Sequence, residues 1–231
     1  RPVAANVPNY RILLVREETK DVDQVLTQLQ KLIAINPNDL EKARRELFRR
    51  SAFVPVTIAE NLNWSDFVRV AANAPALPGL LTDVGLSRIY PQKENLAHVV
   101  GYVGPVSDHY LSRTEDPDPL LQIPRFQVGK TGVEAQMEHS LRGSAGHQRI
   151  EVNAVGRVMR ELERAEGQPG ATVKLTIDSK IQNFALARMD GLSASAVVID
   201  CATGDLLAVA SSPSFDPNLF VRGISRKNYN A

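Results

Sequence analysis

The stretch Gly129-Lys130-Thr131-Gly132-Val133-Glu134 places two glycines three positions apart and an acid just behind them. Glycine reaches backbone angles that other residues avoid, so this spacing favours a tight turn from a strand into a helix. A carboxylate in the first turn of a helix suits the positive end of the helix dipole. The segment 135–141 continues as the short helix and ends at Arg142-Gly143. We predict that Glu134 pairs with an arginine such as Arg88 or Arg142.

Part of the same stretch, Lys130-Thr131-Gly132, matches one of three signatures of serine acyl-transferases that react with β-lactams. Those enzymes also need Ser-x-x-Lys, which sets the nucleophile one helical turn from its lysine. No serine in the chain has a lysine three positions later, and Ser-x-Asn is absent. We therefore interpret the match as coincidence and expect no catalytic residue in this sequence.

Composition excludes several classes of protein. The 231 residues, 43% of them apolar, suffice for one large core or two modest ones. Lys plus Arg number 27 against 26 for Asp plus Glu, so the net charge of +1 indicates no broad nucleic-acid face. The longest apolar runs fall far short of the roughly 20 residues of a membrane helix.

Periodicity predicts a strand at 10–15 and three helices in the first third of the chain. The first helix lies at 22–33, and Asp39 is expected to N-cap the second. The third is expected at 65–72. The apolar stripe of the second helix comprises Leu40, Ala43, Leu47 and Phe48.

Alternation of polar and apolar residues at 148–155 predicts a half-buried strand, closed by a turn at Gly156. A candidate linker follows at 167–170, and the pattern then changes to strand, helix and hairpin. The residues on which these elements rest are Val173, Leu175 and Ile177 for the strand, Ile181, Phe184, Ala185 and Met189 for the helix, and 194–199 with 205–210 for the hairpin.

The sequence gives little support for a cysteine nucleophile, a metal site or a calcium-binding loop. Cys201 follows an apolar run without a nearby histidine or cation, so we interpret it as structural and not as a nucleophile. The four histidines are too scattered for a metal site, and we expect neither metal nor cofactor. The segment 116–119 lacks the ligand spacing of a calcium loop and is interpreted as a surface loop.

The motifs together resemble the non-catalytic pedestal of class B penicillin-binding proteins. Four segments occur in that family's order: Arg88-Ile89-Tyr90-Pro91, 97–104, the Gly129 to Gly143 stretch, and 151–157. Further segments at 175–182, 198–204 and 212–218 resemble the opening of the family's transpeptidase domain, and 215–225 points to its elongation subtype. The residues that the resemblance marks as structural are Arg88, Tyr90, Pro91, Gly129, Gly132, Glu134, Arg142 and Gly143.

The resemblance implies an α+β fold: an extended, multi-segment pedestal with a helical head at 1–167, then an incomplete α/β transpeptidase domain at 168–231. The intact parent would be a serine-type peptidoglycan D,D-transpeptidase on the periplasmic face of the inner membrane, anchored by an N-terminal helix absent from this chain. It would act on stem peptides and bind a polytopic glycosyltransferase of the elongation machinery and a periplasmic shape-determining scaffold protein. Two alternatives stay open: a stand-alone periplasmic interaction domain, and an unusual serine hydrolase using Lys130.

Overall fold

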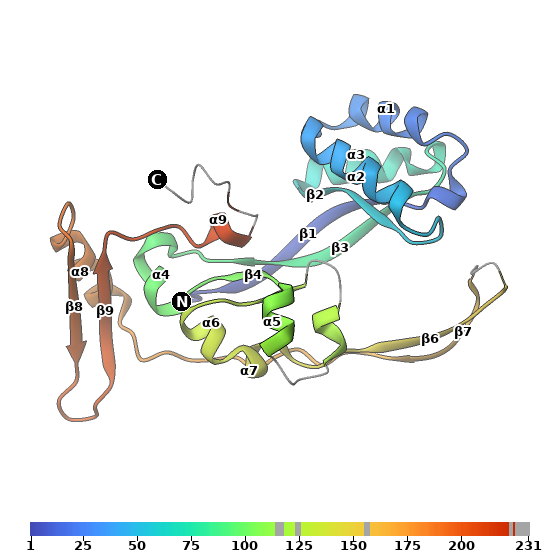
Figure 1. The fold of residues 1–231 in the computed structure, drawn as a ribbon. Coiled ribbons are helices and arrows are strands. Elements are labelled where there is room, and N and C mark those ends of the chain that lie inside the picture. Colours follow the sequence, from blue (N-terminus) through green and yellow to red (C-terminus); the bar gives the residue numbers. More distant parts are fainter. Residues whose placement is uncertain (114–117, 123–125, 155–157, 222–223, 225–231) are drawn as a thin grey trace. The chain divides into compact units, whose positions relative to one another are not determined.

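The computed structural model describes residues 1–113, 118–122, 126–154, 158–221 and 224. The chain folds into two compact units, each formed from separate stretches of sequence. Unit 1 contains 1–6, 88–150 and 161–231, and unit 2 contains 7–87 and 151–160. The chain combines helices with strands, as predicted for an α+β fold. The strands form small separate sheets (Figure 1).

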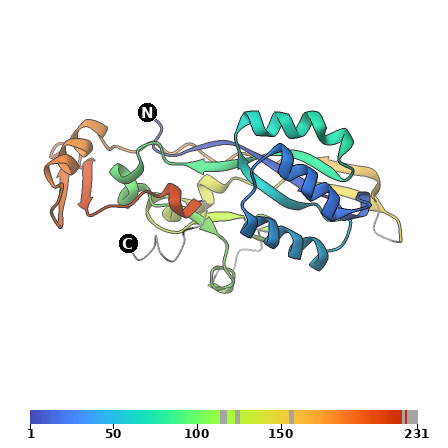
Figure 2. The ribbon, with the colours of Figure 1, turned by 90° about the horizontal axis from the view of Figure 1, so that it is seen from above.

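Unit 2 contains the helical head. Its sheet has the order β2-β1-β3, and three helices pack with it around one apolar core (Figure 2). Helix α1 contacts α3, whereas α2 contacts β2. The elements are β1 (Ala5–Leu14), η1 (Arg16–Glu18), α1 (Val22–Leu32), α2 (Pro37–Arg49), β2 (Val56–Leu62), α3 (Trp64–Asn73), η2 (Ala74–Ala76) and β3 (Leu80–Ile89).

The helix starts of the head follow capping rules, with one correction. Asp21 and Asn63 cap α1 and α3 through their side chains. The predicted cap of α2 at Asp39 is wrong, because Asn36 accepts the amide of Asn38 and Pro37 occupies the first helical turn. Phe48 is also not buried as predicted: its ring is 60% exposed and lies beneath the Arg16 guanidinium.

Unit 1 begins with short elements around a second, smaller core that includes Tyr90, Leu96 and Val100. Strands β4 and β5 pair antiparallel, with Gly104 opposite Val128. The predicted helix after Gly132 is present but is interrupted at Met137. These elements are η3 (Lys93–Leu96), α4 (Ala97–Val100), β4 (Val103–Pro105), α5 (Asp108–Arg113), η4 (Pro119–Gln122), β5 (Gln127–Gly129), α6 (Gly132–Gln136) and α7 (Glu138–Arg142).

A two-stranded ribbon follows, formed by β6 (His147–Val152) and β7 (Val158–Ala165). Every residue of β6 is exposed, so the prediction of a half-buried strand is wrong. Alternation had indicated a buried face, but no layer packs on it among the described residues. The turn expected at Gly156 lies outside the described residues.

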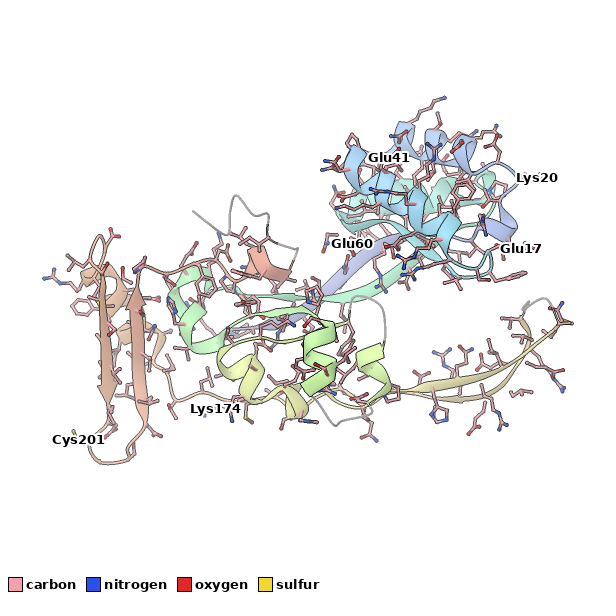
Figure 3. All side chains as sticks on the ribbon, in the orientation of Figure 1. Glu17, Lys20, Glu41, Glu60, Lys174 and Cys201 are labelled. Atoms are coloured by element: carbon pink, nitrogen blue, oxygen red, sulfur yellow. The ribbon has the colours of Figure 1, made fainter. Side chains whose placement is uncertain are left out.

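The last part of unit 1 consists of α8 (Ser179–Arg188), β8 (Ala194–Ile199), β9 (Leu206–Ser212) and α9 (Asn218–Val221). The predicted hairpin is confirmed, and Gly204 in its turn has a φ of +79°. The predicted strand at 173–177 is wrong: this segment belongs to no strand, although Asp178, which follows it, donates its amide to the Leu207 carbonyl. Cys201 is exposed at the β8–β9 turn and takes no part in the core (Figure 3).

Burial in α8 also differs from the expected stripe. Phe184 is 68% exposed, whereas Gln182 is buried. The Gln182 amide donates to the carbonyls of Asn95 and Val209 and accepts the amide of Val209, each at 2.8–2.9 Å. A buried amide that satisfies three backbone groups is a stable arrangement, and it joins α8 to β9 and to η3.

Candidate functional site

The centre of the motif region is Glu134, whose side chain is 4% exposed in the first turn of α6. The Arg88 Nε donates to its Oε1 at 2.7 Å, so the predicted ion pair exists and uses Arg88. The Arg88 Nη1 donates to Asn6 Oδ1 at 3.1 Å. A buried carboxylate needs a charge partner and a hydrogen bond, and Arg88 supplies both to Glu134. The contact with Asn6 holds the Arg88 guanidinium.

Tyr90 lies beside this ion pair. Its hydroxyl accepts the amide of Val103 at 2.9 Å, and its ring is buried. Burial raises the pKa of the Tyr90 phenol, and the negative charge of Glu134 raises it further. The phenol therefore stays protonated at neutral pH and acts as a structural hydrogen-bonding group that joins β4 to the Glu134 site.

Three glycines let the backbone segments of this region touch. A Cβ on Gly101 would lie 1.9 Å from the Thr131 carbonyl oxygen, and one on Gly129 would lie 2.0 Å from that of Glu134. Gly132 has a φ of +60°, in the left-handed region. The predicted tight turn is therefore explained by close backbone approach as well as by the turn geometry.

Arg142 forms a second buried charge cluster and not the alternative partner of Glu134. Its side chain, 2% exposed, donates from Nη1 to Asp118 at 2.7 Å and from Nε to Glu138 at 3.1 Å. The other oxygen of Glu138 accepts the amide of Gly129 at 2.6 Å. Burial opposes ionisation of Asp118, but the Leu120 amide and Arg142 lower the pKa of that carboxyl overall.

Sequence reasoning missed Asp118 and Glu138. Asp118 was assigned to a surface loop, of which 116–117 lie outside the described residues. The signal that was available is the spacing of Glu138 and Arg142, four residues apart on one helix face.

Gly143 and the expected linker at 167–170 are held together. Ser144 and Gln168 exchange two backbone hydrogen bonds of 3.0 and 3.1 Å, and the Ala171 amide donates to the Ser140 carbonyl at 2.7 Å. A Cβ on Gly143 would meet the Gln168 carbonyl oxygen at 2.2 Å. The segment is therefore attached to the end of α7 and is not a free linker. Pro91, by contrast, is exposed and belongs to neither charge cluster as the described residues form them.

Asn218, in the segment that resembles the elongation subtype, clamps Tyr90 by its backbone. The Asn218 side-chain oxygen accepts the Tyr90 amide at 2.9 Å, and its nitrogen donates to the Tyr90 carbonyl at 3.0 Å. Phe215 and Phe220 complete an aromatic cluster with His98 and Tyr102, with ring centroids 4.1–6.1 Å apart. The 215–220 segment is therefore packed on the motif region.

Lys130 is the one motif residue with a plausible chemical role, and its surroundings are structural. Its Nζ lies 5.5 Å from the centroid of the Tyr110 ring, a cation–π distance. Burial lowers the pKa of the Lys130 ammonium, and Glu138 partly offsets this. No serine stands at the required spacing from any lysine. Within the described ranges, no group of three acids, histidines or cysteines could hold a metal ion.

These residues are packed against one another, paired in charge and hydrogen-bonded to backbone groups, as in a structural region of a protein. Residues 1–175 match the Penicillin-binding Protein dimerisation domain, and the chain belongs to that family.

Relatives confirm the assignment along the whole chain. Peptidoglycan D,D-transpeptidase MrdA of Escherichia coli K12 is 35% identical over 231 residues, which are 100% of this chain and 36% of that protein. MrdA of Haemophilus influenzae is 32% identical over 228 residues, 98% of this chain and 35% of that protein. The chain thus spans about a third of the length of these relatives.

Two solved structures share the fold. The complex between penicillin-binding protein PBP2 and MreC from Helicobacter pylori matches with a TM-score of 0.79 at 23% identity, over 100% of this chain and 42% of that one. PBP2 from Helicobacter pylori matches with a TM-score of 0.72 at 21% identity, over 99% and 43%. The α+β pedestal fold expected from the sequence is therefore confirmed.

Proposed function

We propose that this chain is the periplasmic, non-catalytic portion of a peptidoglycan D,D-transpeptidase that cross-links stem peptides during cell elongation. The observation that carries the proposal is the 35% identity to MrdA over the whole chain. The role of the portion is to support the catalytic domain. Two buried charge clusters and close backbone packing are what a rigid support requires.

We further propose that residues 1–167 form the pedestal and that 168–231 begin the transpeptidase domain. The segment 171–178, between the Ser144–Gln168 contact and α8, has neither helix nor strand, which supports a change of domain here. The family match ends inside this segment, at residue 175. In this arrangement the Asn218 clamp and the aromatic cluster attach the second part to the first.

The proposed partners are a polytopic glycosyltransferase of the elongation machinery and a periplasmic shape-determining scaffold protein. The scaffold is supported by the structural neighbour solved as a complex of PBP2 with MreC. The proposed location is the periplasmic face of the inner membrane. In the part of the chain that the structure describes, no helix is long and apolar enough to cross a bilayer.

Labelling with a fluorescent penicillin, followed by intact mass measurement, tests the proposal. The chain and a version extended through the next Ser-x-x-Lys of its gene are compared. We expect acylation of the extended protein alone, because an acyl-serine needs a nucleophile next to its lysine. Acylation of the 231-residue chain itself would revive the serine hydrolase that uses Lys130. Acylation of neither protein would favour the stand-alone interaction domain.

A further inference from the structure

A pocket in unit 1 is lined by none of the residues of the two charge clusters. Its volume is about 740 Å³, within the range of about 300–1,000 Å³ that is usual for ligand sites. The walls come from η3, from α8, from the turn at 190–193 and from the segment 211–214 at the end of β9. All four belong to unit 1, so the pocket lies within one compact body.

Hydrogen bonds across the pocket region hold its walls together. Asn95 Nδ2 donates to Asn183 Oδ1 at 2.9 Å, which joins η3 to α8. Ser214 Oγ donates to the Glu94 carbonyl at 2.7 Å, which joins the segment after β9 to η3. The buried Gln182 joins α8 to β9. The pocket is therefore formed before any ligand binds, and this limits the cost of ordering its walls around a ligand.

The charged side chains of the lining are both acidic. Glu94 and Asp190 line the pocket, whereas no lysine, arginine or histidine among the described residues does so. Neither carboxylate has an ion pair or a hydrogen bond within the part of the chain that the structure describes. Two carboxylates without a cationic partner make the potential in a pocket negative, which favours a positively charged ligand.

The rest of the lining favours an organic cation over a metal ion. Leu186 and Leu192 contribute apolar surface, which suits an aliphatic chain. The hydroxyls of Ser193 and Ser211 and the side-chain oxygen of Asn95 can accept hydrogen bonds from an ammonium group. A calcium or magnesium ion needs about six oxygen ligands that converge. Among the described residues, no group of three acids, histidines or cysteines could hold a metal ion.

We infer that this pocket binds an aliphatic primary amine, with the ammonium group at Glu94 and Asp190 and the carbon chain on Leu186 and Leu192. Two sources share this chemistry. A stem peptide that accepts a cross-link must carry a free amine, and this source rests on the proposed function. The other source is a free diamine in solution.

Titration of the 231-residue chain with cadaverine, followed by the amide chemical shifts in NMR spectra, tests the inference. We expect saturable shifts at the amides of Ser193 and Ser211, which line the pocket. Pentanediol, which has the same carbon chain without the charge, should leave these shifts unchanged. Absence of shifts with cadaverine, or equal shifts with pentanediol, would overturn the inference. Tighter saturation by calcium chloride would overturn it in favour of a metal site.

Neutral variants test the two carboxylates in the same titration. Both are exposed, so Glu94→Gln and Asp190→Asn should each raise the dissociation constant of cadaverine by about threefold. The double variant should raise it by about tenfold, since separate charges act independently. Glu17→Gln is the control, because Glu17 is an exposed acid of unit 2. An unchanged dissociation constant in the double variant would contradict the site.

A stem peptide with a free amine, compared with the same peptide acetylated at that amine, distinguishes the two sources. Binding of the free peptide more tightly than cadaverine, and its loss on acetylation, assigns the pocket to the stem peptide. Tighter binding of cadaverine assigns it to a free diamine. Penicillin labelling of the extended protein does not depend on this pocket, so a failure of amine binding leaves the proposed function standing. Saturation by cadaverine that survives acetylation of the peptide's amine, with equal binding of both peptides, would overturn the role given to the ammonium group of the peptide.

Discussion

At the scale of single residues, the stability of the motif region depends on ion pairs whose side chains are largely buried. Glu134 and Arg142 are each less than 5% exposed at the side chain. Breaking such a pair leaves an uncompensated buried charge, which costs far more than losing a pair at the surface. These pairs therefore contribute to the stability of unit 1.

Glu134→Ala should lower the stability of unit 1 by about 3 kcal/mol, because Arg88 is left partly buried without its carboxylate. The expected fall in melting temperature is several degrees, measured by differential scanning calorimetry. Lys42→Ala is the control, since its pair with Asp39 is 65% and 60% exposed. Its effect should stay within about 1 kcal/mol. An unchanged melting temperature for Glu134→Ala would refute the role given to this pair.

Asp118 should contribute to stability only where it is ionised. Its pKa in the folded chain lies below the ordinary value of 3.8, so the folded state favours the carboxylate. The contribution is complete above that ordinary value and is lost as the pH falls through the lower folded pKa. Urea unfolding at several pH values should show Asp118→Asn less stable than the native chain at pH 6, with the difference vanishing in strong acid. A constant difference would contradict this sign.

At the scale of elements, α4 and α6 meet by their backbones. Gly101 has a φ of +78° and faces the Thr131 carbonyl, so two separate requirements exclude a side chain there. Gly204 has nearly the same φ, +79°, but nothing lies within 4 Å of its missing Cβ. Comparing substitutions at the two glycines therefore distinguishes the cost of backbone strain from the cost of a steric clash.

Gly204→Ala should therefore cost about 1 kcal/mol, the strain of a left-handed alanine. Gly101→Ala should cost about 3 kcal/mol or more, because the methyl group also forces the two helices apart. Chemical unfolding of both variants gives the comparison. Equal losses would mean that the approach of α4 to α6 is not tightly constrained.

At the scale of the whole molecule, the two units have separate cores of unequal size. The head core contains buried side chains from all three strands and all three head helices, whereas the core around Tyr90 is small. Residues 194–212 form only a two-stranded sheet. We therefore expect the protection of backbone amides against exchange to differ along the chain.

Native-state amide exchange should show weaker protection in residues 168–221 than in the pedestal, residues 1–167, because the outer edge of β8 has no strand partner among the described residues. The amide of Val209, held by Gln182, provides an internal reference for the protected side of β9. Equal protection in both parts of the chain would contradict the prediction.

Features that depend on local chemistry can be predicted from the sequence alone. The glycine turn at 129–132 and the β8–β9 hairpin follow from the backbone preferences of individual residues. The absence of Ser-x-x-Lys is likewise a property of the sequence alone. So is the order of motifs that indicated the family.

Burial of a surface and pairing of charges, by contrast, depend on the tertiary structure. Alternation in β6 looked like a buried face, yet the strand is exposed, and Gln182 is buried where Phe184 was expected. Glu134 pairs with Arg88, 46 residues away, whereas Arg142 turns to Asp118 and Glu138. Burial and ion pairing depend on the segments that pack across from a residue, and a pattern along one segment carries no information about them.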